Sequence, residues 1–486
     1  MSAHRTTTYR RTDHPESSPA GAAEALLARF AAIRAELGVR TAFPPDVLVE
    51  AEQVAARPLT LPERDETDTP YLTIDPIGSM DLDQALHIER DGDGHRVRYA
   101  IAHLVSFVAP GGAVDTEARR RGQTIYAPDQ RTPLHPPAFS EAAASLLPEQ
   151  TTPAYVWDMR LDGSGEVAAV ELYPAMVRSS DRLDYASAQE QLDAGTADER
   201  LVLLREVGER RVALEQARGG ATLPMPEQEV EETDDGFVLR LRPLLPVEEW
   251  NAQISLMTGM CAGQLMLDAK VGVLRTMPPP DEQALRRLRA TAKGLGVTWR
   301  EGVPHGEMLR SLDRTNSQHL ALIHEATSLF RGAAYTAFDG EVPEQTEQSA
   351  IAAPYAHVTA PLRRLVDRFG LAVCAALSAG QDVPGWAREA LPSLPEIMAA
   401  SDRLAGAVER DCTDAVEAAV LASLVGRELP GVVVDDGGEK GRDVEVQLAD
   451  PPVLARAKGD AQLGAEVTVR VVAADVAAGA VELEIV

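Results

Sequence analysis

A short acidic segment constrains this chain more than any other feature. The sequence TIDPIGSMDLDQAL, residues 73–86, places Asp75, Asp81 and Asp83 within nine positions among apolar and small residues. Burying one carboxylate costs free energy, and burying three together costs more unless a cation neutralises them. Strand-like YLTID precedes the segment and strand-like ALHIE ends it, so an irregular loop between two strands is expected to carry the aspartates. The fold must therefore neutralise or solvate that loop.

The length and the pattern of strands and helices indicate several domains. At 486 residues the chain is too long for one hydrophobic core. Two helices within 20–56, preceded by a polar tail, predict a disordered tail and a small helical domain of helix-turn-helix or winged-helix type over 1–65. Strands followed by helices predict a mixed α/β domain over 66–426. Residues 427–486 carry about five short strands, which is typical of a closed OB-type barrel. The expected fold class is α+β multidomain.

The central region is expected to combine short strands with a helical second half. Further strands are predicted at YVWDMRL, VAAVELYPAMV and FVLRLRP. The acidic run EQEVEETDD, residues 227–235, is expected to form a solvated strand and turn. Helices are predicted at 247–270, 281–295, 315–333, 360–379 and 396–424.

Composition narrows the cellular context. Cys261, Cys374 and Cys412 lie far apart without metal or redox spacing, which suits a reducing cytoplasm, and all three are expected to pack in helices. No run reaches the roughly 18 apolar residues of a membrane span, and the N-terminus lacks the apolar core of a secretory signal. We therefore expect a cytoplasmic protein without a membrane partner, and a monomer by default. The net charge of −28 weakens a nucleic-acid function without excluding it, because a local basic channel can override the average.

The spacing of the aspartates, D-x5-D-x-D, suggests a metal site. Closely spaced carboxylates on a loop can converge on one point, as the oxygen ligands of magnesium do. The alternative is a turn whose aspartates cap backbone amides, and spacing alone does not choose between the two. The segment lacks the Gly and Glu arrangement of an EF-hand loop.

A second candidate is YAHVTAPLRRLVDRFG, residues 355–370. Thr359 and Pro361 are helix-start signals, so Arg363 and Arg364 are expected in the first turns of a helix. Cations there oppose the helix dipole, which is tolerable if the guanidinium groups recognise phosphate. The alternative is an intrahelical pair of Arg363 with Asp367 on a solvated face.

A third candidate is the loop-rich stretch 118–150. It carries a basic run followed by an isolated tyrosine, Tyr126, before a proline turn. Aromatic residues make up only 4% of the chain, so a tyrosine on a loop near arginines is a candidate base-stacking platform. Half-buried packing of a lone tyrosine is the alternative.

Together these segments resemble the motifs of the ribonuclease II/R (RNB) exoribonuclease family. TIDPIGSMDLDQAL resembles T-I-D-x5-D-x-D-D-A, and GQTIYAPDQRTPLHP…FSEAAASLLP is similar to G-T-S-x-Y-x-P-D-R…P-M-L-P…L-S…S-L-x-P. VLRTMPPP is similar to L-Y-R-x-H-x-x-P, YAHVTAPLRRLVD to Y-A-H-F-T-S-P-I-R-R-Y-x-D, and Glu409-Arg410 to a late E-R pair. The motifs follow the family order over about 71–425, and the terminal barrel resembles the family's S-one-type OB domain.

The resemblance implies a magnesium-dependent hydrolytic exoribonuclease. Such an enzyme would degrade single-stranded RNA from the 3′ end and release 5′-mononucleotides. By motif position, Asp75, Asp81 and Asp83 would be catalytic carboxylates of the metal site, with Asp83 the most important to the chemistry. Carboxylates and an arginine suit in-line hydrolysis, which needs an activated water and neutralisation of charge on the phosphate.

The resemblance also implies roles in binding the RNA 3′ end. Tyr126 would stack on the terminal base, and Arg363 would meet the scissile or adjacent phosphate. Arg364 and Glu409 would support the 3′-end pocket.

The chain departs from the family pattern at several positions. Gln84 replaces a fourth aspartate; its amide oxygen can still hold a metal, but one negative charge is lost, so we expect weaker magnesium affinity or a preference for manganese. Gln253 is nearest to the usual paired glutamates, His103 stands where the family usually has Asp, and residues 222–227 offer no second aromatic clamp.

The flanking regions allow two roles each. Arg29, Arg34 and Arg40 make the N-terminal helices a candidate nucleic-acid module, or the helices simply cover the catalytic core. The terminal barrel has no Phe, Tyr or Trp over 427–486, so a weak RNA guide is expected there.

Two other functions compete with the exoribonuclease. One is a catalytically weakened RNA-binding protein on the same fold, with the metal site degraded at Gln84. Retention of Asp75, Asp81, Asp83 and Arg363 favours the enzyme. The other is a metal-dependent phosphatase or nuclease of unrelated fold, which the aspartate spacing alone allows and the later motifs do not.

Overall fold

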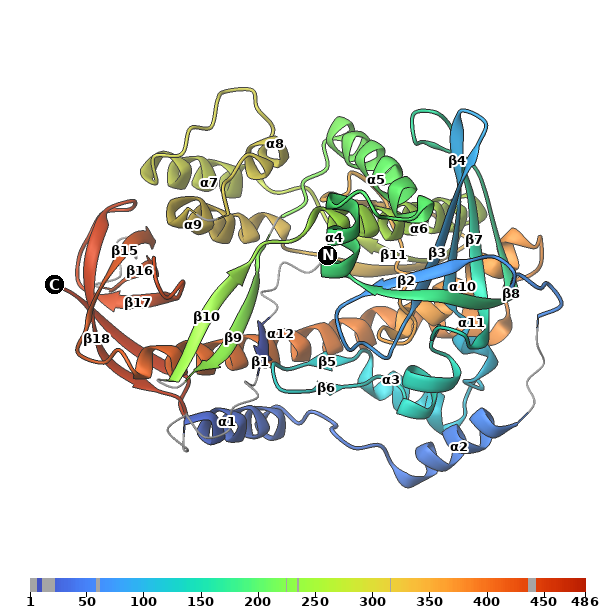
Figure 1. The fold of residues 1–486 in the computed structure, drawn as a ribbon, viewed down its shortest axis with the longest axis horizontal. Coiled ribbons are helices and arrows are strands. Elements are labelled where there is room, and N and C mark those ends of the chain that lie inside the picture. The colour runs from blue at the N-terminus through green and yellow to red at the C-terminus, as the bar shows by residue number, and fades with distance from the viewer. Residues whose placement is uncertain are drawn as a thin grey trace.

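The computed structural model describes residues 7–10, 22–57, 62–223, 225–233, 236–314, 316–435 and 443–486. Within these residues the chain forms two closed five-stranded barrels connected by the long helix α12 (Leu394–Ala422) (Figure 1). The central barrel and its covering helices form one end of the molecule, and the C-terminal barrel forms the other.

The central barrel buries both faces of its strands. Its order is β2–β3–β4–β7–β8, closed by the parallel pairing of β2 with β8. In register across three strands, Ala85, Ala100 and Val156 join one hydrophobic cluster, while their neighbours Leu86, Tyr99 and Trp157 join another. Burial on both sides explains why consecutive residues in the middle of these strands are apolar. The strands are β2 (Tyr71–Asp75), β3 (Gln84–Asp91), β4 (Gly94–Ala102), β7 (Thr151–Leu161) and β8 (Val167–Asp184).

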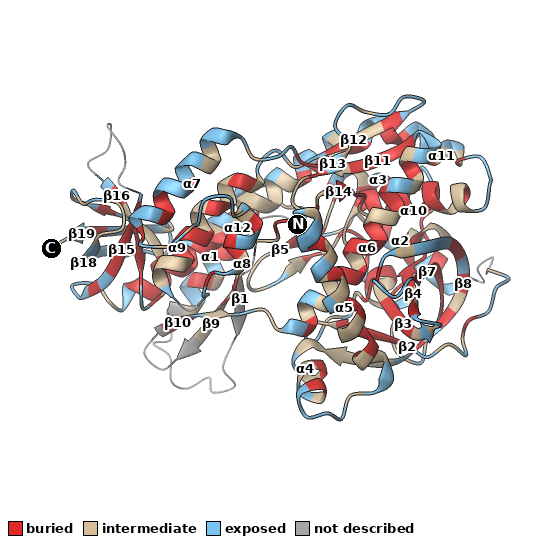
Figure 2. Ribbon diagram, turned by 90° about the horizontal axis from the view of Figure 1, so that it is seen from above, coloured by how far each residue is buried: buried red, intermediate tan, exposed pale blue. Residues whose placement is uncertain are grey.

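Helices cover the second of these faces. They include α4 (Tyr185–Asp193), α5 (Glu199–Arg218), α6 (Pro246–Ala269), α10 (Leu365–Ser378) and α11 (Gly385–Ala390), with η4 (Leu391–Ser393) after them. Buried residues gather where α6 and α10 meet the barrel strands (Figure 2). The prediction of a helix at 247–270 is confirmed by α6. The helix predicted at 360–379 begins later, at Leu365, and α4 and α5 were not predicted.

Short elements connect the barrel to the rest of the chain. They are η1 (Leu104–Ser106), α3 (Ala113–Arg121), β5 (Ile125–Tyr126), β6 (Arg131–Thr132), η2 (Phe139–Ala143), β13 (Glu347–Gln348) and β14 (Ala353–Pro354). Between β11 (Val271–Thr276) and β12 (Ala334–Asp339) lies a helical insertion of α7 (Glu282–Gly294), α8 (His305–Arg310), α9 (Ser317–Ala326) and η3 (Thr327–Phe330). The helices predicted at 281–295 and 315–333 are thereby confirmed.

The C-terminal barrel confirms the predicted five-stranded OB-type unit. Its order is β15–β16–β17–β19–β18. Its hydrophobic core is continuous with α12, which confirms the helix predicted at 396–424, and with the hairpin β9–β10. The bounds are β9 (Glu227–Thr233), β10 (Gly236–Arg242), β15 (Glu428–Asp435), β16 (Asp443–Leu448), β17 (Leu454–Lys458), β18 (Glu466–Asp475) and β19 (Ala480–Ile485).

The N-terminal helices do not form the expected helix-turn-helix-like domain. Helix α1 (Ala22–Glu36) buries Leu26, Phe30 and Ile33 in the cluster of α12 and the C-terminal barrel. Helix α2 (Pro45–Ala56) buries Val47 and Val54 in a different cluster, with α3 and η2. That prediction was wrong because an amphipathic helix shows which face is buried and not what covers it.

Part of the expected disordered tail is a strand. Thr7–Arg10 form β1, which pairs in parallel with β9. The rest of the predicted tail, residues 1–6 and 11–21, lies outside the described residues.

The three N-terminal arginines lie against carboxylates. The Arg29 guanidinium lies 2.9 Å from Glu36, Arg34 is buried against Asp129, and Arg40 lies 4.0 Å from Glu117. Arg34 and Arg40 thus join the N-terminal segment to the loops around α3 and β5, which favours a covering role.

The cysteines lie in helices, as predicted. Cys261 is in α6, Cys374 in α10 and Cys412 in α12, and all three are free thiols. Over the described ranges, no helix combines the length and apolar character needed to cross a membrane.

Candidate active site

The acidic loop, residues 75–84, connects two barrel strands. Asp75 ends β2 and Gln84 begins β3, so the loop lies at one end of the barrel. Backbone contacts fix it: the amide of Ala102 donates to the carbonyl of Asp83 at 3.0 Å, and the amide of Leu82 donates to the Ser145 hydroxyl at 2.9 Å. The predicted position of the aspartates between two strands is therefore confirmed.

Asp83 is the most enclosed carboxylate of the loop. It is 2% exposed, and its Oδ1 accepts a hydrogen bond of 2.7 Å from the backbone amide of Leu362. Its Oδ2 lies 3.5 Å from Nε of Arg363. Desolvation raises the pKa of Asp83 well above its ordinary value, despite the opposing effect of Arg363. The carboxylate is thus held where its negative charge is poorly solvated.

Asp75 and Asp81 share this environment. Burial raises the pKa of Asp75 to about 6, and the nearby charge of Asp81 adds to the increase. The Oδ2 atom of Asp75 is buried and has no hydrogen-bond partner within the described part of the chain. Asp81 instead forms an ion pair with Arg131. Asp81 is close enough that its charge raises the pKa values of both Asp75 and Asp83.

A second segment, residues 359–364, is tied to the acidic loop. The Gln84 side-chain amide donates to the carbonyl of Thr359, and Leu362 donates to Asp83 as described. On its other side, the amide of Thr124 donates to the carbonyl of Arg363 at 2.9 Å. The Arg363 side chain, 42% exposed, is therefore held between the acidic loop and the Tyr126 strand.

The contacts of the two arginines correct the sequence prediction. Arg363 precedes α10 and contacts Asp83, so the alternative pair of Arg363 with Asp367 is wrong. Arg364, whose side chain is 15% exposed, pairs with Asp367 instead and donates to both of its carboxylate oxygens at 2.8 Å. The amide of Ala360 also donates to Asp367 at 2.7 Å, so Asp367 fixes the turn that presents Arg363.

Tyr126 lies next to this turn because two backbone strands meet there. Gln123 forms a β-bridge with Arg364, and the amide of Leu365 donates to the carbonyl of Gly122 at 2.9 Å. Gly122 has φ of +73°, and a Cβ atom there would lie 2.6 Å from Ser401, so this close approach needs glycine. Tyr126 follows on β5 with 51% of its surface exposed, which fits an open stacking platform better than packing.

A cavity of about 600 Å³ lies against these residues. Of the predicted site residues, the cavity wall contains Gln84, Tyr126, Arg363, Arg364 and Glu409. Asp75, Asp81 and Asp83 are not part of the wall, but Asp83 contacts Arg363, which is. The fold thus brings together residues from β3, β5, α12 and the turn before α10.

Comparisons with known proteins agree with this architecture. The profile of the RNB domain matches residues 63–370, and that of the RNase II-type exonuclease C-terminal S1 domain matches 427–486. The chain belongs to the RNB family. Its catalytic-domain match includes the acidic loop, Tyr126 and Arg363.

Individual relatives are distant and longer. Ribonuclease R of Escherichia coli (strain K12) is 26% identical over 444 residues, covering 82% of this chain and 52% of that protein. Across these relatives, the chain spans from about one third to just under three fifths of their length. RNase R of Mycoplasma genitalium, solved with ribose-methylated single-stranded RNA, matches 95% of this chain and 78% of its own with a TM-score of 0.84 at 17% identity. Yeast Ssd1, described as a pseudonuclease, matches 84% of this chain and 51% of its own with a TM-score of 0.64 at 17% identity.

The RNB site fits a divalent cation in chemistry and only partly in arrangement. The buried Oδ2 of Asp75, which has no hydrogen-bond partner among the described residues, and the desolvated Asp83 are hard oxygen donors, and the pKa values of both carboxylates stay raised although Arg363 is near. Among the described residues, however, no group of three or more His, Cys, Asp or Glu side chains is placed to hold a metal ion together. Asp81 is the carboxylate of the three that is engaged by Arg131.

A cluster of cavity residues was missed by the sequence analysis. Arg275 lies 3.2 Å from Asp402 and stacks over the ring of Tyr335 at 4.4 Å, and the Tyr335 hydroxyl lies 2.7 Å from Nδ1 of His357. Burial lowers the pKa of His357 well below its ordinary value, so the imidazole is neutral. Arg275 and His357 lie within the family-like segments VLRTMPPP and YAHVTAPLRRLVD, which was the available signal.

Two departures from the family pattern have structural roles. His103 is buried with Nδ1 2.7 Å from the Ser106 hydroxyl, and burial lowers its pKa to about 4. Gln253 donates to Glu215 at 2.6 Å in the helical layer. Both side chains are accommodated by local hydrogen bonds.

Proposed function

We propose that this RNB protein is a divalent-metal-dependent, hydrolytic exoribonuclease that degrades single-stranded RNA from the 3′ end to 5′-mononucleotides. The observation that carries the proposal is the contact of Arg363 with buried Asp83 at the wall of a cavity that also presents exposed Tyr126. Phosphate neutralisation, a carboxylate centre and a base-stacking ring are thereby adjacent, which is the set of roles that phosphodiester hydrolysis needs.

The chain's own residues divide the work between binding and chemistry. Tyr126 offers its exposed ring to the terminal base, and stacking is tolerant of base identity. Arg363 is positioned to bind a phosphate by forked hydrogen bonds, since its side chain is partly exposed while its backbone is fixed on both sides. Arg364 and Asp367 hold the turn, and Glu409 borders the cavity where the 3′ end would lie.

Asp75 and Asp83, with Gln84 and Asp81, are the residues that would hold the cation. A divalent ion, magnesium or manganese, would supply water activation and charge neutralisation at the phosphate. The orphaned oxygen of Asp75 and the desolvation of Asp83 support this assignment.

The runner-up function is RNA binding without turnover on the same fold. Gln84 in place of an acidic ligand and a pseudonuclease among the structural neighbours favour it. Asp75, Asp81, Asp83 and Arg363 are all retained, and this argues for the enzyme.

A time course on 5′-labelled single-stranded RNA tests the proposal. The assay compares manganese, magnesium and chelator, with the Asp83→Asn protein as control. We expect a metal-dependent ladder that collapses to a short 5′ fragment and is absent for Asp83→Asn. Intact RNA under every condition, with RNA still bound, would favour the runner-up.

A further inference from the structure

The hairpin that presents Tyr126 also brings a cation to the acidic loop. Tyr126 on β5 pairs in register with Arg131 on β6. The Arg131 guanidinium contacts Asp81 through one terminal nitrogen and lies 2.9 Å from Glu141 through the other. Arg131 is thus held between two carboxylates from different parts of the chain, one of which belongs to the acidic loop.

This contact changes the charge available to a divalent ion. The loop carries three carboxylates, at Asp75, Asp81 and Asp83, and Gln84 adds none. Arg131 lies against Asp81, Arg363 lies near Asp83, and the charge of Arg182 also acts on Asp75, so positive charges already face all three carboxylates. The side chains of Arg131 and Asp81 are only 27% and 13% exposed, so solvent screens their attraction incompletely. An ion that binds Oδ1 of Asp81 must therefore displace a guanidinium, and an ion that binds only Oδ2 must share the charge of the carboxylate with it.

Glu141 provides a second partner for the displaced arginine. Its contact with Arg131 uses the nitrogen that does not contact Asp81. When Asp81 turns to an ion, Arg131 can remain paired with Glu141, so the exchange does not leave a partly buried guanidinium without a counter-charge.

We propose that Arg131 is a resident cation of the acidic loop, a positioning residue that competes with the divalent ion for Asp81 and thereby weakens ion binding. The proposal rests on the proposed function in assuming that this loop takes a divalent ion. It assigns Arg131 no contact with RNA and no part in bond cleavage.

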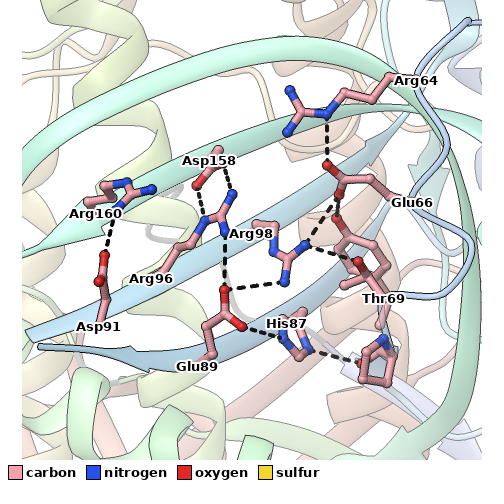
Figure 3. Close-up of polar contacts among 12 residues, drawn as sticks. Arg64, Glu66, Thr69, His87, Glu89, Asp91, Arg96, Arg98, Asp158 and Arg160 are labelled. Carbon is pink, nitrogen blue, oxygen red and sulfur yellow. Dashed lines mark hydrogen bonds and ion pairs between the residues drawn. The ribbon is translucent and has the colours of Figure 1, made fainter.

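Calorimetric titration of the chelator-treated full-length protein with Mn²⁺ tests the proposal without RNA. We expect Arg131→Gln to bind Mn²⁺ about tenfold more tightly than the wild type, because the ion no longer competes with a guanidinium. A tenfold change corresponds to roughly 1.4 kcal/mol of binding free energy. Arg160→Gln is the matched control, because it removes an arginine paired at 2.8 Å with Asp91 elsewhere on the barrel (Figure 3). Its Mn²⁺ affinity should equal that of the wild type. Unchanged or weaker binding by Arg131→Gln would overturn the proposal.

Two further variants keep the test decisive. Glu141→Gln removes the alternative partner of Arg131, so it should weaken Mn²⁺ binding several-fold; equal or tighter binding would contradict the competition, even if Arg131→Gln does not fold. In an Asp81→Asn background, Arg131→Gln should change the Mn²⁺ affinity little, because the shared carboxylate is gone. A full tenfold effect there would overturn a mechanism through Asp81.

The outcomes separate this inference from the proposed function. Tighter Mn²⁺ binding by Arg131→Gln with no RNA degradation by any variant would support the inference and reject the enzyme. Metal-dependent RNA degradation with equal Mn²⁺ affinities would reject the inference alone.

Discussion

Strand β3 connects two groups of carboxylates whose pKa values are shifted in opposite directions. It begins at the acidic loop with Gln84 and ends at Asp91. Asp91 belongs to a cluster of charged side chains on the barrel, which we call the ladder; its members are Arg64, Glu66, Glu89, Asp91, Arg96, Arg98, Asp158 and Arg160. In the ladder, Arg96 donates to both oxygens of Asp158, at 2.9 and 2.6 Å, and to Glu89 at 3.3 Å (Figure 3). Although burial opposes it, hydrogen bonding to Arg96 holds the pKa of Asp158 below its ordinary value.

The acidic loop shows the reverse. Burial raises the pKa values of Asp75 and Asp83, and the arginine near Asp83 does not compensate. Both groups have arginines nearby, so the difference lies in geometry: forked hydrogen bonds in the ladder, against a single 3.5 Å approach of Arg363 to Asp83. The ladder thus compensates its carboxylates internally, whereas the raised pKa values in the loop agree with the proposed binding of a cation there.

The largest effect is expected from neutralising the loop. Asp83→Asn should reduce RNA degradation at least about 100-fold, a loss typical of removing one electrostatic catalytic group. It should leave the free energy of unfolding unchanged or raise it, because the amide can still accept from Leu362 and avoids burying a charge. The labelled-RNA assay and urea unfolding measure the two quantities. Wild-type activity in the folded variant would remove Asp83 from the catalytic centre.

At the buried end of the ladder we expect the converse: a substitution that lowers the free energy of unfolding and leaves RNA degradation intact. Glu66 accepts hydrogen bonds from the hydroxyls of Tyr71 at 2.6 Å and Tyr173 at 2.8 Å, and from Nε of Arg64 at 3.0 Å. Glu66→Gln points an amide donor at these donors, so it should cost about 2 kcal/mol of unfolding free energy. Urea unfolding at equal m-value checks the cost. Loss of RNA degradation by the folded variant, without loss of stability, would reverse the roles of ladder and loop.

The sequence was sufficient wherever the signal was local. The strands on either side of Asp75 and Gln84, the late helices and the terminal barrel follow from periodicity and turns within each segment. The site residues were recognised through family-like motifs, and the structure brings Gln84, Tyr126, Arg363, Arg364 and Glu409 to one cavity.

Contacts between segments that are distant in the sequence could not be predicted from periodicity and turns within each segment. Arg363 was expected in the first turns of a helix, but it precedes α10 and contacts Asp83, because the backbone of residues 122–124 holds the turn before α10 outside the helix. The pair of Arg131 with Asp81 depends in the same way on a hairpin placed by tertiary packing. The prediction that helices α1 and α2 form one domain was wrong for a related reason: an apolar stripe shows that a helix face is buried but not which element covers it.

The tyrosines beside the ladder and beside the acidic loop differ in exposure. Tyr71 and Tyr173 are buried and serve the ladder, whereas Tyr126 beside the loop is half exposed. Tyr126→Ala should therefore weaken RNA binding about tenfold, within the range for one stacked base, and change the unfolding free energy by less than about 0.5 kcal/mol. Tyr126→Phe is the matched control and should bind like the wild type. Binding is measured by fluorescence anisotropy with labelled RNA in chelator, and equal binding by Tyr126→Ala would exclude the stacking role.

A smaller effect depends on pH. The pKa of Asp75 is about 6 in the folded protein, above the 3.8 of an ordinary aspartate, so the folded state binds more protons between those values. The ionised carboxylate therefore lowers stability progressively as pH rises from about 4 to 6. Asp75→Asn should be more stable than the wild type at pH 7, by at most the roughly 3 kcal/mol that a shift of about two pKa units corresponds to, and the gain should disappear near pH 4. Unfolding in chelator across this range measures the difference, and a gain independent of pH would assign it to packing.

The smallest effect is expected at the exposed end of the ladder. Arg160 lies 2.8 Å from Asp91, and their side chains are 55% and 41% exposed, so solvent and salt screen the pair. Arg160→Gln should change the unfolding free energy by less than about 0.5 kcal/mol, the usual scale for surface pairs. The contrast with Glu66→Gln then locates the ladder's stabilising effect in its buried hydrogen bonds rather than in its number of ion pairs. Urea unfolding in low and high salt measures it; a loss as large as that of Glu66→Gln would instead mean that the charges act as one network along β3 and β4.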